Sequence, residues 1–221
     1  MSKIQSNRGG CKDVFNAFLV ENAEYAGDYE IPVISSYEGE LPISMVPFSK
    51  RRQCSSNNWI CFYEDDVNFE GIWKSPKKHL ETLKSYDGII LPDFSIYRDM
   101  PLAMQIWNIY RSRAIGTWLQ ENEISVIPNI RWGDERTYDI VCDGLSKHSV
   151  IAVGSHGLMK DTAERQSFIK GLDYIINRLE PHTILVYGAI PNEVFQYPRF
   201  LGIEIVPYPS YTSLIFQGGI A

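Results

Sequence analysis

The chain has 221 residues, enough for one large domain or two small ones with a real core. Hydrophobic residues make up 44% and charged residues 22%, as in ordinary globular proteins. A net charge of −6 and a pI near 5.3 disfavour a protein that coats duplex nucleic acid. No stretch approaches the roughly 18 apolar residues of a membrane span, and residues 1–10 lack the apolar core of a secretory signal. We therefore expect a cytoplasmic protein with no membrane partner.

The chain holds four cysteines, Cys11, Cys54, Cys61 and Cys142. They form no C-x-x-C pair, and their spacing fits no zinc template. This pattern is typical of free thiols in a reducing cytoplasm.

The first part of the chain differs from the rest. Residues 1–40 contain one short helical pattern, at 12–21, followed by a stretch rich in Tyr, Glu and Gly. We expect residues 1–40 to form an arm or cap on a single α/β domain of residues 41–221.

Short apolar runs predict strands, which alternate with helical patterns. The predicted strands lie at 42–47, 59–63, 88–92, 125–129, 149–153, 183–187 and 203–207. The predicted helices lie at 76–85, 101–121, 135–143, 161–179 and 191–199. Repeated βα units predict a parallel sheet. Their spacing fits an incomplete TIM-like barrel or an open doubly wound sheet, and the polar residues that follow every strand favour the incomplete barrel.

Those polar residues also predict the position of a site, because parallel α/β folds gather ligands at the carboxyl ends of their strands. The densest cluster is the segment 129–136. Asn129 and Arg131 share a face of the extended chain. Arg131 would hold a phosphate or carboxylate, with Trp132 as a stacking wall. The alternative is a structural Arg–Asp pair, with Trp132 in the core.

A second cluster follows the strand at 88–92. Asp93 would bind a hydroxyl or a metal, or act as a general base. Tyr97 and Arg98 follow it, and Asp99 is an expected N-cap for the helix that begins near Pro101.

A third cluster has small residues around a histidine. Gly154, Ser155 and Gly157 would cradle an anion with their backbone N–H groups, and His156 would serve acid–base chemistry or metal ligation. The alternative is a structural histidine. The dipeptide Tyr187-Gly188 is a weaker candidate for a ligand-contacting loop.

Carboxylates after one further strand suggest a divalent metal. The run Glu64-Asp65-Asp66, together with Asp93 and Asp134, would offer oxygen ligands to Mg or Mn. The alternative is a solvated loop or a helix cap. No Walker loop and no G-x-G-x-x-G are present, so standard ATP and dinucleotide sites are not supported.

Three of these segments resemble a known family. They run from Asp93 to Pro101, from Arg131 to Thr137 and from Ile184 to Gly188. They are similar to the uncharacterised bacterial and phage family of the domain of unknown function 4417, over roughly residues 40 to 210. The resemblance implies an origin in a mobile element, which suits a protein that counters host defence. It implies no activity, cofactor or catalytic residue.

The leading hypothesis is an enzyme-like protein with a pocket for a small anionic ligand. The favoured ligand is a nucleotide, and the favoured reaction is hydrolysis or phosphodiester chemistry. The acid–base candidates are Asp93, Asp134 and His156, and the ligand-binding candidates are Tyr97, Arg98, Asn129, Arg131, Trp132, Gly154, Ser155, Gly157, Tyr187 and Gly188. The rival is a non-catalytic protein that sequesters a signalling nucleotide or inhibits a host defence protein. The sequence makes no prediction of oligomeric state.

Overall fold

The computed structural model describes residues 13, 15–54 and 57–216 of the chain. Cys11 lies outside the described residues, and so do residues 1–10, for which the sequence predicts no secretory signal. The strands of the main body are β3 (Met45–Pro47), β4 (Trp59–Cys61), β5 (Gly88–Ile90), β6 (Val126–Ile127), β7 (Val150–Gly154), β8 (Thr183–Tyr187) and β9 (Glu204–Tyr208). Each lies within or next to a predicted run.

The strands form two parallel sheets whose order follows the chain. One sheet has the order β3-β4-β5-β6 and the other the order β7-β8-β9. A parallel β-bridge between Asn129 and Ala152 joins them, because Ala152 N donates to Pro128 O at 2.9 Å and Ile130 N donates to Ala152 O at 2.8 Å. The predicted parallel α/β fold is therefore confirmed.

Both sheets contribute to one inner apolar cluster. Residues spaced by two along a strand point to the same face, and alternate strand residues fill this cluster. Its buried members are Met45, Trp59, Cys61, Ile90, Ile127, Val150, Ala152, Leu185, Tyr187 and Tyr208. Tyr208 Oη donates to Pro42 O at 2.6 Å, which ties the end of β9 to the segment before β3. Within the described ranges no ladder joins β9 to β3.

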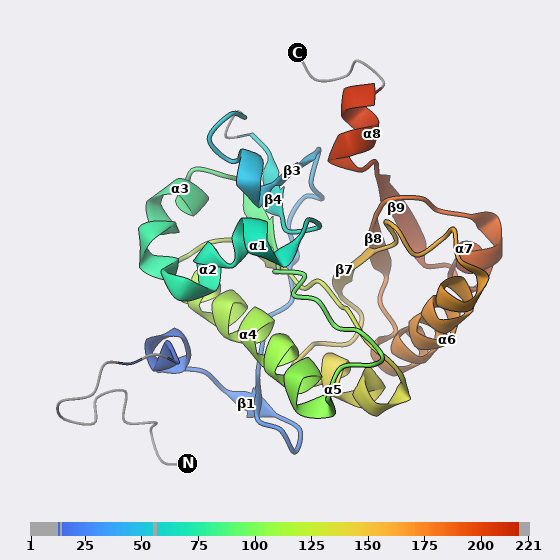
Figure 1. Cartoon of the computed structure of the whole chain (residues 1–221), viewed down its shortest axis with the longest axis horizontal. Helices are drawn as coiled ribbons and strands as arrows, with labels where there is room; N and C mark the ends of the chain where they lie inside the picture. Colours follow the sequence, from blue (N-terminus) through green and yellow to red (C-terminus); the bar gives the residue numbers. More distant parts are fainter. Residues whose placement is uncertain (1–12, 14, 55–56, 217–221) are drawn as a thin grey trace.

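The helices lie around the outside of the sheets (Figure 1). They are α1 (Asp66–Phe69), α2 (Gly71–Lys74), α3 (Leu80–Lys84), α4 (Leu102–Glu121), α5 (Tyr138–Cys142), α6 (Thr162–Leu179), α7 (Asn192–Phe200) and α8 (Tyr211–Phe216). Short 3-10 helices complete the list: η1 (Ala17–Val20), η2 (Phe48–Lys50), η3 (Pro76–Lys78) and η4 (Glu135–Thr137). The helix expected at 76–85 is divided into η3 and α3.

Helix α4 is buried around most of its circumference. The sheets lie on one side of it and the N-terminal segment on another, so it carries buried polar residues as well as apolar ones: Gln105, Asn108, Arg111, Ser112, Arg113 and Thr117. Its N-cap is Pro101, and no side chain caps it. The prediction that Asp99 caps this helix was therefore wrong, because the helix begins one residue after Pro101.

The N-terminal segment packs on α4. It contains η1 and the antiparallel pair β1 (Tyr25–Ala26) and β2 (Ile31–Pro32). Leu19 and Ile34 are buried in the same cluster as Ile115 of α4. The division of the chain near residue 40 stays a prediction.

The described residues also bear on membrane-spanning helices and on the cysteines. Throughout the described ranges, no helix is long and apolar enough to cross a membrane. Cys54, Cys61 and Cys142 are free thiols, and Cys61 and Cys142 are buried.

Candidate functional site

An open cleft of about 1210 Å³ lies at the carboxyl ends of β4 to β7. The segments that follow these strands form its walls, together with one face of α6. Its polar lining consists of Tyr63, Glu64, Asp65, Asp66, Asp93, Ser95, Tyr97, Arg98, Asp99, Arg131, His156, Glu164 and Ser167. Of the predicted site residues, the cleft brings together Asp93, Tyr97, Arg98, Arg131, Trp132, Gly154 and His156.

A chain of hydrogen bonds fixes Asp93 in the cleft. Asn129 Nδ2 donates to Oδ1 of Asp93 at 2.8 Å, and Arg131 Nη1 donates to Oδ2 at 2.6 Å. Tyr63 Oη in turn donates to Oδ1 of Asn129 at 2.9 Å. Asp93 is only 9% exposed, so each of its oxygens has the partner that a buried carboxylate requires.

Arg131 is partly open to the cleft despite its ion pair. Its side chain is 30% exposed. The Asp93 carboxylate raises the pKa of Arg131 above its ordinary value, so the guanidinium is charged at every physiological pH. The guanidinium carbon of Arg131, Cζ, lies 5.8 Å from the ring centroid of Tyr97, and Tyr97 is itself 52% exposed. A fixed cation beside an exposed ring suits a ligand that has both a negative group and a planar group.

Local backbone features place these groups. Asn129 and Arg131 lie two residues apart in an extended segment, and the bridge to Ala152 holds that segment beside β7. Gly154 lies under Tyr63, since a Cβ there would come within 2.9 Å of Tyr63 Cδ1. Any larger residue would push Tyr63 away from Asn129.

Tyr187 supports the site from below. Its ring stacks on Tyr63 with 4.5 Å between the centroids, and its Oη accepts from Tyr211 N at 2.9 Å. Burial raises the pKa of both Tyr63 and Tyr187, so both phenols are neutral at physiological pH. Tyr187 does not line the cleft.

The segment after β7 contributes one side chain to the rim. His156 is exposed and lines the cleft, whereas Gly157 is exposed beyond it. Ser155 is buried, and its Oγ donates to Ala189 O at 2.6 Å. Gly188 packs against Ser155, and its φ of +120° favours glycine. Ser155 and Gly188 therefore hold the loop in place and do not face a ligand.

Two other predicted residues have structural partners. Asp134 caps η4 and forms an ion pair with Arg136 at 2.8 Å, and hydrogen bonds from Arg136 lower the pKa of Asp134. Trp132 is 9% exposed and packs on Phe168 with 5.0 Å between ring centroids. Gly171 of α6 makes room for it, because a Cβ there would come within 2.0 Å of Trp132 Nε1. One edge of Trp132 lines the cleft, and Asp134 does not.

The sequence did not single out three residues that the cleft contains. Tyr63 anchors Asn129, and its position two residues after Cys61 is the signal for its inward direction. Ser95 donates from N and Oγ to Asp66, with 2.8 Å from Oγ to Oδ1. Glu164 of α6 forms an ion pair with Arg98 at the rim, and no sequence motif indicates it.

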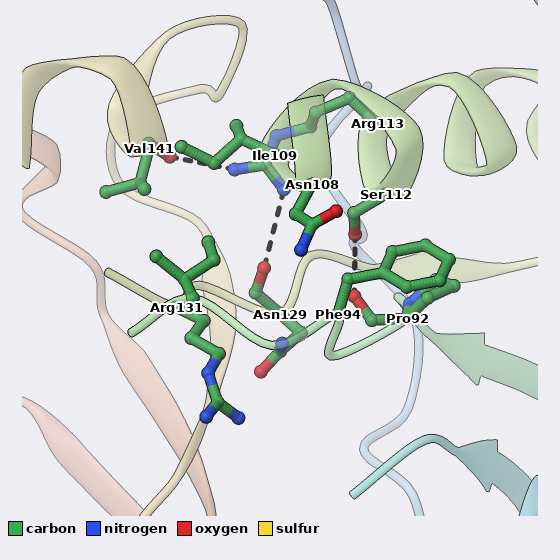
Figure 2. Close-up of a pocket in the computed structure, with 10 residues that line it drawn as sticks. Pro92, Phe94, Asn108, Ile109, Ser112, Arg113, Asn129, Arg131 and Val141 are labelled. Atoms are coloured by element: carbon green, nitrogen blue, oxygen red, sulfur yellow. Dashed lines mark hydrogen bonds between the residues drawn. The ribbon is translucent and has the colours of Figure 1, made fainter. Parts of the chain in front are cut away.

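A much smaller cavity of about 20 Å³, the size of about one water molecule, lies behind Asn129. Arg113 of α4 is 2% exposed there and donates to Val141 O at 2.8 Å and to Asn129 O at 3.4 Å (Figure 2). Burial lowers the pKa of Arg113 to about 10. Figure 2 also shows the Arg131 guanidinium pointing away from Arg113. Arg113 therefore fixes the backbone whose side chain holds Asp93.

The carboxylates of the cleft do not converge on one point. Across residues 13, 15–54 and 57–216, no group of three or more His, Cys, Asp or Glu side chains is placed to hold a metal ion. A divalent metal would have to be held in part by the ligand.

A family model and two related proteins agree on what this chain is similar to. The model of the family described as Domain of unknown function (DUF4417) matches residues 23–208. The chain is 32% identical over 205 residues to the "Gene 1 protein" of Mycobacterium phage L5, which covers 88% of this chain and 89% of that protein. It is 30% identical over 214 residues to the "Gene 1 protein" of Mycobacterium phage D29, covering 95% of this chain and 77% of that protein. The resemblance noted in the sequence is therefore confirmed.

Proposed function

We propose, for a chain that belongs to the DUF4417 family, that the cleft binds a small anionic ligand of the nucleotide class. One observation carries the proposal. Arg131 is fixed by Asp93 at 2.6 Å, yet 30% of its side chain is exposed to a cleft at the carboxyl ends of parallel strands. A guanidinium already oriented by a protein carboxylate loses little conformational entropy when it binds a phosphate.

The size and lining of the cleft support a ligand with a ring. Its volume of about 1210 Å³ exceeds the roughly 300–1,000 Å³ of common small-molecule sites, so a nucleotide has room. The exposed ring of Tyr97 and the edge of Trp132 offer stacking surfaces near Arg131.

The preferred activity is hydrolysis or phosphodiester chemistry. His156 on the rim and Asp93 on the floor are the acid–base candidates inside the cleft. One of them would accept a proton from water as its oxygen attacks phosphorus, and the other would return a proton to the leaving oxygen. Asp134 is the weaker candidate, because Arg136 occupies its carboxylate outside the cleft.

One observation favours a second function, which is binding without catalysis. Both oxygens of Asp93 already accept hydrogen bonds, from Asn129 at 2.8 Å and from Arg131 at 2.6 Å, so its carboxylate is occupied by protein partners. Both relatives are phage proteins. The chain would then sequester a signalling nucleotide of host defence, or inhibit a host defence protein.

We also propose that the two sheets form an incomplete TIM-like barrel, and two features of the strands support it. The strand order rises without reversal from β3 to β9, whereas an open doubly wound sheet reverses its order. The inner cluster receives side chains from strands of both sheets, as the interior of a barrel does.

Binding and turnover of a nucleotide panel test the proposal. We expect at least one nucleotide to bind wild-type protein in calorimetry and to lose its affinity with Arg131→Ala. Mass spectrometry of the same mixtures, with and without Mg²⁺ or Mn²⁺, separates the enzyme from the sequestering protein. Failure of every nucleotide to bind would overturn the proposal.

A further inference from the structure

The charges in the cleft are strongly unbalanced. Six carboxylates line it and only two guanidinium groups, those of Arg98 and Arg131. Arg98 pairs with Glu164 and Arg131 with Asp93. Within the described residues, no ion pair neutralises the other four carboxylates, those of Glu64, Asp65, Asp66 and Asp99. These four carboxylates, called the acidic wall below, would repel a ligand with several negative charges.

Tyr97 connects the cation to the acidic wall. Arg131 lies over its ring, at 5.8 Å from the centroid. At the other end of that ring, Tyr97 Oη donates to Ser95 Oγ at 3.2 Å, and Ser95 Oγ donates to Asp66 Oδ1 at 2.8 Å. A planar ligand that lies along Tyr97 from Arg131 therefore reaches Asp66.

Asp66 offers only acceptors to such a ligand. Ser95 N and Oγ orient its carboxylate, which is partly exposed to the cleft. An oriented carboxylate binds N–H donors and rejects carbonyl oxygens. Cytosine and adenine present an exocyclic amine where uracil and hypoxanthine present a carbonyl, and guanine carries a 2-amino group that hypoxanthine lacks.

We infer that the cleft selects nucleotides with a single phosphate and an amino-bearing base, with the phosphate at Arg131 and the exocyclic amine at Asp66. This inference rests on the proposed function, because it assumes that the cleft binds a nucleotide. It adds the chemical class of that nucleotide.

Calorimetry with matched nucleotides tests the inference in a metal-free buffer. CMP and UMP differ at the group on C4, and GMP and IMP differ only in the 2-amino group. We expect wild-type protein to bind CMP and GMP about tenfold more tightly than UMP and IMP, the usual effect of one hydrogen bond to a charged group. We also expect CTP to bind more weakly than CMP, because its added charges face the four unneutralised carboxylates.

Two substitutions separate hydrogen bonding from charge. Asp66→Asn keeps an oxygen that can accept from Ser95 but places an amide donor in the wall, so we expect the preference for CMP over UMP to disappear or reverse. Asp65→Asn removes the same charge from a neighbouring exposed residue and should leave the preference unchanged.

The outcomes distinguish this inference from the proposed function. If no nucleotide of the set binds, both are overturned. If all of them bind without preference for an amine or for a single phosphate, the inference is overturned and the proposed function stands. Equal effects of Asp65→Asn and Asp66→Asn would likewise overturn the role of Asp66.

Discussion

Tyr63 and Tyr187 stack with 4.5 Å between their ring centroids and an interplanar angle of 16°. Tyr63 follows β4 in the four-stranded sheet, and Tyr187 ends β8 in the three-stranded sheet. The stack therefore joins the two sheets directly beneath the cleft. Since Tyr63 also donates to Asn129, the packing of the sheets and the position of Asp93 are coupled.

The first prediction separates these two roles of Tyr63. Tyr63→Phe keeps the stacked ring but removes the donor to Asn129. We expect the free energy of unfolding to fall by about 1–2 kcal/mol and nucleotide affinity to fall as well, because Asn129 is freed from its partner. The matched control is Tyr187→Phe, which keeps the stack and removes only the contact with Tyr211 N. Chemical denaturation and calorimetry would measure both effects, and equal losses of affinity in the two variants would contradict the coupling.

The second prediction concerns the anion site. Arg131→Ala should weaken ligand binding by roughly 2–5 kcal/mol, because it removes a charge-assisted contact from a partly buried position. The control is Arg98→Ala, which removes an exposed guanidinium paired with Glu164 at the rim of the same cleft. We expect the control to change affinity by less than about 1 kcal/mol. A normal affinity in folded Arg131→Ala would show that Arg131 serves only to hold Asp93.

The sequence predicted most of the parallel α/β fold because each βα unit carries its own signal. Short apolar strands and long helices such as α4 and α6 have distinct patterns, and Asp161 caps α6 as its type suggests. It missed α1 and α2, because two helices of four residues each, separated only by Glu70, show no periodic stripe.

For the candidate site, the rule that ligands gather after parallel strands was the useful signal. It predicts that Asp93, Arg131 and His156 lie at the same end of the sheet, and all three line the cleft. It did not decide between a stacking wall and a core position for Trp132, since that choice depends on Gly171 in a distant helix. Contacts between residues far apart in the chain, such as that of Arg98 with Glu164, leave no local pattern.

A third prediction tests the loop that carries His156. Gly188→Ala should destabilise the fold by several kcal/mol, because φ is +120° and a Cβ would come within 2.8 Å of His156 N. Gly157→Ala is the control, since φ there is +83° but nothing lies within 4 Å of a Cβ. Its cost should be only about 1 kcal/mol of backbone strain. Thermal unfolding would compare the two, and similar costs would mean that crowding at Gly188 is relieved by movement of the loop.

A fourth prediction concerns alkaline pH. Burial raises the pKa of Tyr110 and Tyr208 to about 12, and it also raises those of Tyr63 and Tyr187. Tyrosine in the unfolded chain ionises near pH 10, so the stability that these groups contribute is fully present below about pH 10 and is lost as the pH rises through the folded pKa. Arg113, with its pKa lowered to about 10, acts in the opposite direction.

We therefore expect the free energy of unfolding to fall between about pH 10 and about pH 12, because the tyrosines outnumber Arg113. Tyr208→Phe should make this fall smaller by about 2 kcal/mol at most. Denaturant titrations across this range, with tyrosinate absorbance as a second signal, would measure it. A slope that is unchanged in Tyr208→Phe would show that Tyr208 ionises with an ordinary pKa.

The last prediction separates catalysis from sequestration. Asp93→Asn keeps the shape of the side chain but cannot take a proton, and its amide still has an oxygen for Arg131 or Asn129. In an enzyme, this change should abolish turnover and leave nucleotide affinity within about tenfold, because general acid–base groups act mainly on the transition state.

His156→Ala is the companion variant, because His156 lines the cleft from an exposed position and its removal should leave the fold intact. In an enzyme that uses His156, turnover should fall by about 100-fold or more with little change in affinity. In a sequestering protein neither variant has turnover to lose, and Asp93→Asn acts only by weakening the support of Arg131. Product analysis by mass spectrometry, paired with calorimetry on the same samples, measures both quantities. Wild-type protein that retains a nucleotide tightly and leaves it chemically unaltered, with and without Mg²⁺ or Mn²⁺, would exclude the enzyme and establish the sequestering function.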